Sequence, residues 1–187
     1  MTHIEFESLR RQPQYLGLTA QQVARAVNSE REAERLRTKL ARFLPVAQSV
    51  ASMSKYQGTK VGALILGPDF EIRASGWNGA PRGSAADEDQ RTQDRTTRLL
   101  WAAHAEANAI AQAARVGTAL AGCQMVVTFM PCASCAKLIV QAGIIRVACP
   151  RPSSEFLERW GDEIEVAEAM FKECGVELIL LEGVADE

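Results

Sequence analysis

From residue 61 to residue 181 the chain alternates short apolar runs with segments whose apolar residues recur at helical spacing. The first two runs are joined by Gly67-Pro68-Asp69, a typical turn sequence, and fit two antiparallel strands. The later runs are separated by helical segments, as expected for strands joined by crossover helices. We therefore predict a three-layer α/β/α fold, in which a mixed five-stranded sheet has helices on both faces. The predicted strands are 61–66, 70–75, 124–129, 144–148 and 176–181. The predicted helices are 132–141, 164–173 and one that begins between residues 95 and 102 and ends at about residue 116.

The first 44 residues have a different pattern. Residues 1 to about 19 show no clear period and are expected to form an irregular or loosely attached lead-in. From Thr19, a suitable N-cap, to Leu44, apolar residues recur at helical spacing and predict an amphipathic helix. Pro45 either ends or kinks this helix or opens a second one. We therefore divide the 187 residues into an N-terminal helical extension, residues 1–44, and one compact domain, residues 45–187.

Composition excludes several classes of protein. The chain is 47% hydrophobic with a formal net charge of -2, values of an ordinary globular protein with no overall attraction for polyphosphate. No apolar run approaches the roughly 18 to 20 residues that span a bilayer, and the N-terminus lacks the apolar centre of a signal peptide. The five cysteines are odd in number, which does not suit a disulfide framework. We therefore expect a cytoplasmic protein that acts neither at membranes nor on duplex nucleic acid.

Two short motifs carry the candidate chemistry. His104 and Glu106 lie near the start of an alanine-rich helix, where burying an ionisable pair is costly unless a metal or partner compensates. Pro131, Cys132 and Cys135 follow a predicted strand and open a helix, whose positive end favours thiolates. One imidazole and two thiolates leave the fourth position of zinc to water, as in a catalytic site. Glu106 is suited to carry protons for that water.

Each motif alone has another interpretation. Two cysteines three residues apart also suit a thiol–disulfide redox site, and a histidine beside a glutamate on a helix is often structural. Together they match the H-x-E and P-C-x-x-C signature of zinc deaminases that act on cytosine or adenine. The remaining cysteines are each expected to be small packed apolar residues, so no second metal site is supported. They are Cys123, Cys149 and Cys174.

The stretch from Ser54 to about Ile145 resembles the deoxycytidylate deaminase family, within the cytidine deaminase-like superfamily. The resemblance rests on residues 59–63, 76–81, 104–110 and 131–144. The chain also departs from the family in three places. Tyr56-Gln57 stands where many relatives carry Asp-Pro, the region between Gly83 and Trp101 is shorter than the zinc-bearing insertion of some phage members, and the N-terminal helix is additional.

This resemblance implies hydrolysis of deoxycytidine monophosphate (dCMP) to deoxyuridine monophosphate (dUMP) and ammonia, by attack of zinc hydroxide on C4. His104, Cys132 and Cys135 would hold Zn²⁺, and Glu106 would move protons from the water to N3 of the ring and then to the departing amine. Two alternatives within the superfamily are a zinc deaminase of a tRNA base and one of a 5-substituted deoxycytidylate. A non-catalytic zinc module is a third, but it has no use for a proton carrier beside an open coordination position.

The resemblance also implies substrate contacts. Asn78 and Asn108 correspond to family positions near the nucleotide, and the backbone of Ala105 and the carbonyl of Met130 would read the edge of the pyrimidine. A phosphate dianion prefers charge-assisted donors. The residues expected near the phosphate are Ser54, Lys55 and Arg82.

The larger members of the family form hexamers that respond to deoxycytidine and deoxythymidine triphosphates. We therefore expect a homo-oligomer, either a trimer or a hexamer, with nucleoside triphosphates as candidate effectors. The amphipathic helix of the extension is a candidate oligomer contact, because its apolar face has to be buried.

Overall fold

The computed structural model describes residues 3–56, 58–86 and 94–182, and it divides the chain into two compact units, Met1–Lys39 and Leu40–Glu187. The boundary predicted between residues 44 and 45 lies close to this division and stays a prediction. Among the described residues, no helix combines the length and the apolar character needed to cross a membrane.

The first unit is helical. It contains α1 (His3–Leu9), a short 3-10 turn (Pro13–Tyr15) and most of α2 (Ala20–Ala41). The prediction of an irregular lead-in was therefore wrong, because the buried Tyr15 folds back and donates a hydrogen bond to the Glu30 carboxylate of α2. The predicted start of α2 is confirmed. The Thr19 hydroxyl accepts from the Gln22 amide at 3.3 Å and the Gln22 side chain accepts from the Thr19 amide at 2.9 Å, which is a capping box.

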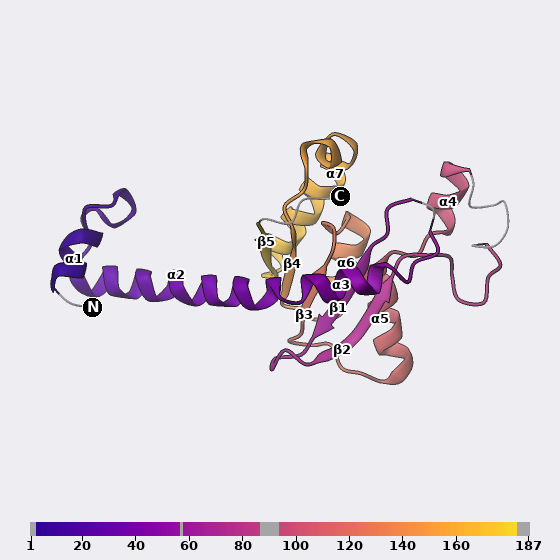
Figure 1. The fold of residues 1–187 in the computed structure, drawn as a ribbon, viewed down its shortest axis with the longest axis horizontal. Helices are drawn as coiled ribbons and strands as arrows, with labels where there is room; N and C mark the ends of the chain where they lie inside the picture. Colours follow the sequence, from indigo (N-terminus) through magenta and orange to yellow (C-terminus); the bar gives the residue numbers. More distant parts are fainter. Residues whose placement is uncertain (1–2, 57, 87–93, 183–187) are drawn as a thin grey trace. The chain divides into compact units, whose positions relative to one another are not determined.

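The second unit contains the predicted mixed sheet (Figure 1). Its strands are β1 (Gly62–Leu66), β2 (Ile72–Trp77), β3 (Gln124–Val127), β4 (Arg146–Pro150) and β5 (Glu177–Leu181), in the order β2-β1-β3-β4-β5. β1 is antiparallel to both β2 and β3, whereas β3, β4 and β5 are parallel. Parallel neighbours need a crossover, and α6 and α7 provide the two crossovers.

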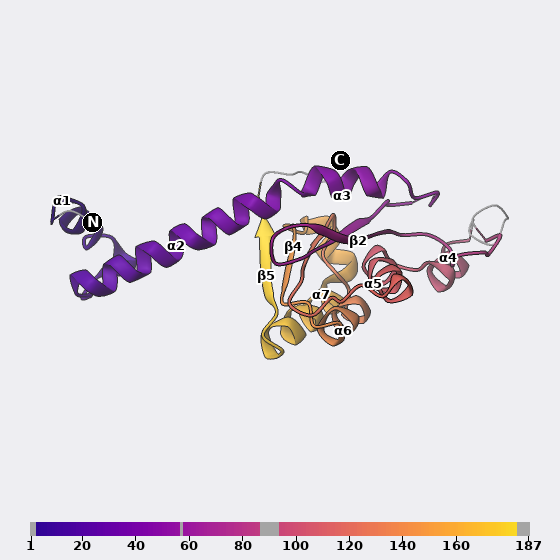
Figure 2. The ribbon, with the colours of Figure 1, turned by 90° about the horizontal axis from the view of Figure 1, so that it is seen from below.

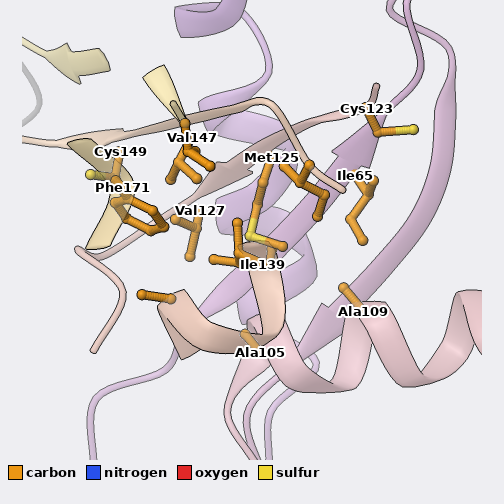
Figure 3. Close-up of a cluster of buried hydrophobic side chains, with 14 of the residues drawn as sticks. Ile65, Ala105, Ala109, Cys123, Met125, Val127, Ile139, Val147, Cys149 and Phe171 are labelled. Atoms are coloured by element: carbon orange, nitrogen blue, oxygen red, sulfur yellow. The ribbon is translucent and has the colours of Figure 1, made fainter. Parts of the chain in front are cut away.

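Helices cover both faces of this sheet, as predicted (Figure 2). α3 (Leu44–Ala51) lies on one face, and α5 (Ala105–Val116), α6 (Ala133–Gln141) and α7 (Ser154–Glu173) lie on the other. Pro45 stands in the first turn of α3, where its missing N–H costs no hydrogen bond. Figure 3 shows the main core, which strand and helix residues fill together. It includes Ile65, Met125, Val127 and Val147 from the strands and Ala105, Ala109, Ile139 and Phe171 from the helices.

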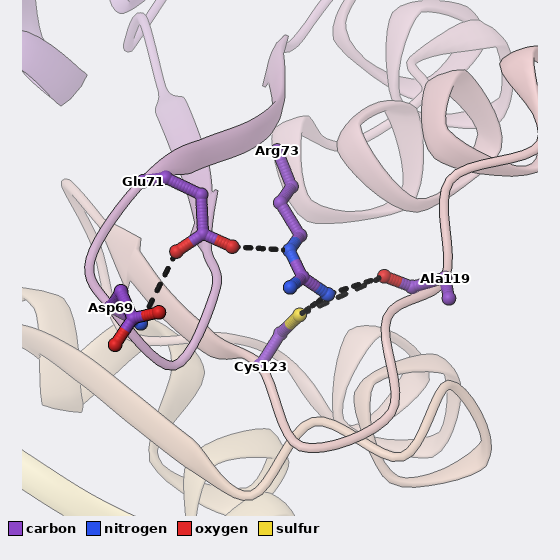
Figure 4. A network of polar contacts seen from close by, with 5 residues as sticks. All are labelled: Asp69, Glu71, Arg73, Ala119 and Cys123. Atoms are coloured by element: carbon purple, nitrogen blue, oxygen red, sulfur yellow. Dashed lines mark hydrogen bonds and ion pairs between the residues drawn. The ribbon is translucent and has the colours of Figure 1, made fainter.

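Of the three cysteines expected to be packed, Cys123 and Cys149 are buried as predicted. The prediction was wrong for Cys174, which is exposed because it lies just beyond the end of α7. Cys123 also contacts a polar network at the turn between β1 and β2 (Figure 4). Arg73 lies 3.5 Å from the Cys123 sulfur and donates to the Ala119 carbonyl at 3.1 Å, while its Nε donates to Glu71 at 2.7 Å. This network ties the predicted turn to the segment before β3.

Two helix boundaries differ from the predictions. One helix is expected to begin between residues 95 and 102 and to end near residue 116, whereas the structure has α4 (Arg95–Trp101) and α5, because Ala103 leaves the helix to pair with Gly79 in a short antiparallel bridge. Their two backbone hydrogen bonds measure 2.8 and 3.1 Å. α7 begins ten residues earlier than predicted, at a start capped by Ser153, whose hydroxyl accepts from the Phe156 amide at 3.2 Å.

The contact between β2 and α5 leaves no room for a side chain at Gly76. A Cβ there would lie 2.4 Å from both the Ala105 carbonyl oxygen and the Ala109 nitrogen. Gly76→Ala is therefore expected to lower the free energy of unfolding by about 1–3 kcal/mol, the usual cost of overpacking. Urea denaturation followed by circular dichroism measures this change.

Gly161 is the matched control. It lies inside α7, and a Cβ there would meet no atom within 4 Å. Gly161→Ala is expected to stabilise by about 0.5–1 kcal/mol through helix propensity. If Gly76→Ala were as stable as Gly161→Ala, the tight contact between β2 and α5 would be wrong.

Candidate active site

The three predicted metal ligands lie at the N-termini of two neighbouring helices. His104 is the N-cap of α5 and Cys132 is the N-cap of α6, and both have extended backbones. Cys135 follows in the first turn of α6 and is buried. α5 and α6 pack against each other on the same face of the sheet, so the sheet brings together residues that are 28 to 31 positions apart.

The spacing of the donor atoms fits a zinc ion. The His104 Nδ1 atom lies 3.5 Å from the Cys132 sulfur and 3.4 Å from the Cys135 sulfur, and all three donor atoms lie within 4.8 Å of one another. With Zn–S near 2.3 Å and Zn–N near 2.0 Å, ligands of a tetrahedral site are separated by about 3.5–3.8 Å. Within the described part of the chain, this is the one group of histidine, cysteine and acidic side chains able to hold a metal ion.

The two thiols differ in their readiness to lose a proton. Interaction with Cys135 is the main cause that lowers the pKa of Cys132 to about 3, and the contact with His104 lowers it further. The same contact with Cys132 and burial raise the pKa of Cys135. Contact with Cys132 is also the main cause that raises the pKa of His104, with smaller contributions from the charges of Glu106 and Glu163. Cys132 is therefore the first thiolate, and metal binding has to displace the proton of Cys135.

Glu106 lies beside this group on the second residue of α5. Its side chain is buried, with 4% of the residue exposed, and burial raises the pKa of its carboxyl group. Its charge contributes to raising the pKa of the Cys135 thiol, and it is not one of the three donors. A carboxyl group whose pKa is raised toward neutrality can both accept and return a proton, as general acid–base catalysis requires.

Two of the predicted substrate residues hold the surrounding loops together. The Asn78 side chain accepts from the Val61 amide at 2.8 Å and donates to the Thr59 carbonyl at 2.9 Å. The Ser54 hydroxyl donates to the Asn78 carbonyl at 2.6 Å. Asn78 and Ser54 are both buried, and their hydrogen bonds join segment 54–61 to the loop after β2. Their contacts with a nucleotide stay predictions.

The other predicted substrate residues surround the same region. The Asn108 side chain donates to the Trp77 carbonyl at 2.8 Å and so ties α5 to the end of β2. Lys55 and Arg82 are exposed, whereas Ala105 and Met130 are buried at the starts of α5 and of the turn into α6. Contacts of these five residues with a substrate stay predictions.

The structure adds two features that the sequence did not reveal. The guanidinium carbon of Arg98, on α4, lies 5.3 Å from the centroid of the Tyr56 ring, and Tyr56 follows the Ser54-Lys55 pair. On α7, the Glu163 carboxylate accepts from the amide of Ala133, the residue after Cys132, at 3.2 Å. Neither has a signal in the sequence, because each depends on how separate helices pack.

The protein combines an open α/β sheet, an imidazole and two thiol groups at converging helix N-termini, and a buried carboxyl group beside them. These features define a class of metal-dependent hydrolases that activate water. A family model described as the cytidine and deoxycytidylate deaminase zinc-binding region matches residues 37–150. The chain belongs to this family, and zinc is the cofactor of the family's site.

Individual relatives agree with this assignment. The chain is 42% identical over 140 residues to an uncharacterized deaminase of Aliivibrio fischeri, a match that covers 75% of this chain and 91% of that protein. It is 36% identical over 138 residues to human deoxycytidylate deaminase, covering 72% of this chain and 74% of that protein. These similarities confirm the predicted family.

Solved structures support the predicted fold. The structure of the dCMP deaminase from the cyanophage S-TIM5 in complex with dCMP and dUMP is similar, with a TM-score of 0.58 and 26% identity over 75% of this chain and 95% of that chain. The apo form of the same phage enzyme gives a TM-score of 0.60 at 24% identity. The predicted cytidine deaminase-like fold is therefore confirmed.

Proposed function

We propose that this protein is a zinc-dependent deoxycytidylate deaminase, which hydrolyses dCMP to dUMP and ammonia. The observation that carries the proposal is the placement of the buried Glu106 carboxyl beside the His104, Cys132 and Cys135 donors. The human relative is named deoxycytidylate deaminase, and the similar phage enzyme was solved with dCMP and dUMP. A small-molecule nucleotide is therefore the expected ligand.

The residues divide the work of the reaction between them. His104, Cys132 and Cys135 would hold the zinc ion, which would lower the pKa of a water molecule to about 7 and so provide hydroxide at neutral pH. Glu106 accepts the proton of the attacking water on its carboxylate, donates it to N3 of the ring, and later helps to protonate the departing amine. Because the Glu106 carboxyl is buried, these transfers occur away from bulk water.

Backbone groups are suited to read the base. Ala105 is the first residue of α5, and an N–H at this position has no carbonyl partner within the helix. It can donate to an oxygen of the pyrimidine, while the Met130 carbonyl, just before Pro131, can accept from the exocyclic amine. Asn78 and Asn108 fix the loop after β2 against β1 and α5, and we assign them contacts with the nucleotide as well.

We assign recognition of the substrate phosphate to Lys55 and Arg82, with Ser54 holding the loop that carries Lys55. Both cations are exposed, and charge-assisted hydrogen bonds favour a phosphate dianion over an uncharged nucleoside. dCMP is therefore expected to have a kcat/KM at least about 10-fold above that of deoxycytidine, the effect of one charged hydrogen bond.

A substrate panel tests the proposal. The purified zinc-loaded protein is incubated with dCMP, deoxycytidine, deoxycytidine triphosphate, 5-methyl-dCMP and tRNA, and ammonia release is followed. Turnover of dCMP with little turnover of tRNA is the expected result. Turnover of tRNA alone would contradict the proposal, and a strong preference for 5-methyl-dCMP would reassign the substrate within the same class.

The assembly and cellular setting are part of the same proposal. We propose a cytoplasmic homo-oligomer, a trimer or a hexamer, to which the extension of residues 1–44 contributes through the apolar positions of α2. Nucleoside triphosphates are the proposed effectors. Light scattering of the purified protein gives the oligomer size, and dCMP assays with added deoxycytidine or deoxythymidine triphosphate test the regulation.

A further inference from the structure

A carboxylate of α7 reaches the metal-ligating end of α6. The Glu163 Oε2 atom accepts from the amide of Ala133 at 3.2 Å, and Ala133 is the first residue of α6, directly after Cys132. Glu163 lies on α7, whereas the metal ligands lie at the starts of α5 and α6. Glu163 is exposed to solvent, so the hydrogen bond lies at the rim of the site.

The packing of α7 fixes the position of this carboxylate. Ala167, one helical turn after Glu163 on the same side of α7, is fully buried, and the neighbouring Ile164 is also buried. α7 packs against α6 along this side. The buried residues Ile164 and Ala167 therefore fix the position of α7, and this position places Glu163 next to the N-terminus of α6.

The carboxylate brings negative charge to a site that has to hold a divalent cation. It satisfies one of the amides that a helix N-terminus leaves without a partner, on the residue next to the Cys132 ligand. Groups that hydrogen-bond around metal ligands typically change metal affinity by about 10- to 100-fold.

We propose that Glu163 is a positioning residue for the zinc site, which holds the start of α6 and strengthens zinc binding through its negative charge. This inference rests on the metal site of the proposed function and not on its substrate. Glu163 touches neither substrate nor reacting atoms in this role, and it acts through the amide of Ala133, the residue after Cys132.

The test compares Glu163→Gln with Glu165→Gln. Glu165 is exposed on the same helix, but two positions correspond to a rotation of about 200°, so it points away from Glu163. Each protein is stripped of metal and titrated with zinc against a chromophoric chelator. Glu163→Gln is expected to weaken zinc binding about 10-fold, whereas Glu165→Gln binds as the unmodified protein does. Added salt should reduce the difference in zinc affinity between Glu163→Gln and the unmodified protein, because salt screens the charge of an exposed carboxylate.

Two further readouts separate this role from a merely structural one. The metal-free Glu163→Gln protein should unfold at the same temperature as the unmodified protein, and its cobalt-substituted form should show a shifted thiolate-to-cobalt absorption band. Glutamine can still accept the hydrogen bond from Ala133, so equal zinc affinity of Glu163→Gln and the unmodified protein would overturn the role of the charge, and equal affinity of Glu163→Ala, which removes the hydrogen bond as well, would overturn the positioning role. Equal losses in Glu163→Gln and Glu165→Gln would overturn the proposal too. An unmodified protein that binds zinc but does not deaminate dCMP would refute the proposed function and leave this inference standing.

Discussion

Replacing Glu106 with glutamine is expected to lower kcat for dCMP by about 10²–10⁴-fold, the usual contribution of a positioned general acid–base group. The amide has the size of the carboxyl group but cannot take up and return a proton. Because Glu106 is not one of the three metal donors, Glu106→Gln should keep its zinc. Initial rates of ammonia release, together with zinc content by atomic absorption, measure both effects.

Glu165→Gln makes the same chemical change at an exposed position of α7 and should leave kcat unchanged. A Glu106→Gln protein with full zinc and an unchanged rate would refute the assigned role. A Glu106→Gln protein without zinc would show instead that the carboxyl group is needed to assemble the site.

Replacing Cys135 with serine is expected to remove zinc, and with it all measurable turnover. Cys135 is one of three donors within 4.8 Å, and it is buried, so no exposed side chain can take its place without rearrangement. A ligand that binds only the folded state stabilises it by RT ln(1 + [L]/Kd), which is about 4 kcal/mol at a 1,000-fold excess over Kd. The melting temperature of the unmodified protein should therefore rise with added zinc, and that of Cys135→Ser should not.

The exposed Cys174 provides the matched control, since Cys174→Ser removes a thiol that lies outside the metal group. This variant should retain zinc, turnover and the zinc-dependent rise in melting temperature. Full zinc content in Cys135→Ser, measured after dialysis against a chelator, would contradict the assignment of Cys135 as a ligand.

Much of the fold was predictable from the sequence because apolar periodicity reports burial. β1 is buried along its whole length and was recognised as an apolar run, and the Gly67-Pro68-Asp69 turn set its antiparallel pairing with β2. The break between α4 and α5 was not predictable in this way. It results from the pairing of Ala103 with Gly79, a contact between distant segments. The first half of α7 was not predicted although Ser153 caps it, because acidic residues interrupt the pattern of apolar residues in this part of the helix.

The metal donors were predictable because the two motifs together match the H-x-E and P-C-x-x-C signature of zinc deaminases. His104, Cys132 and Cys135 converge as expected, since each motif opens a helix on the same face of the sheet. Glu163 could not be predicted, because its place depends on the packing of α7 against α6. The hydrogen bonds that occupy Asn78 and Ser54 were also invisible in the sequence, which shows residue types but not their partners.

The two helix N-caps that carry His104 and Cys132 have a consequence for metal exchange. Both helices are anchored by fully buried side chains, Ala105 and Ala109 on α5 and Ile139 on α6, at positions that do not depend on an ion. The donors are therefore preorganised, and little chain entropy is lost when an ion binds. The metal-free protein is therefore expected to keep its core folded and to take up zinc without refolding.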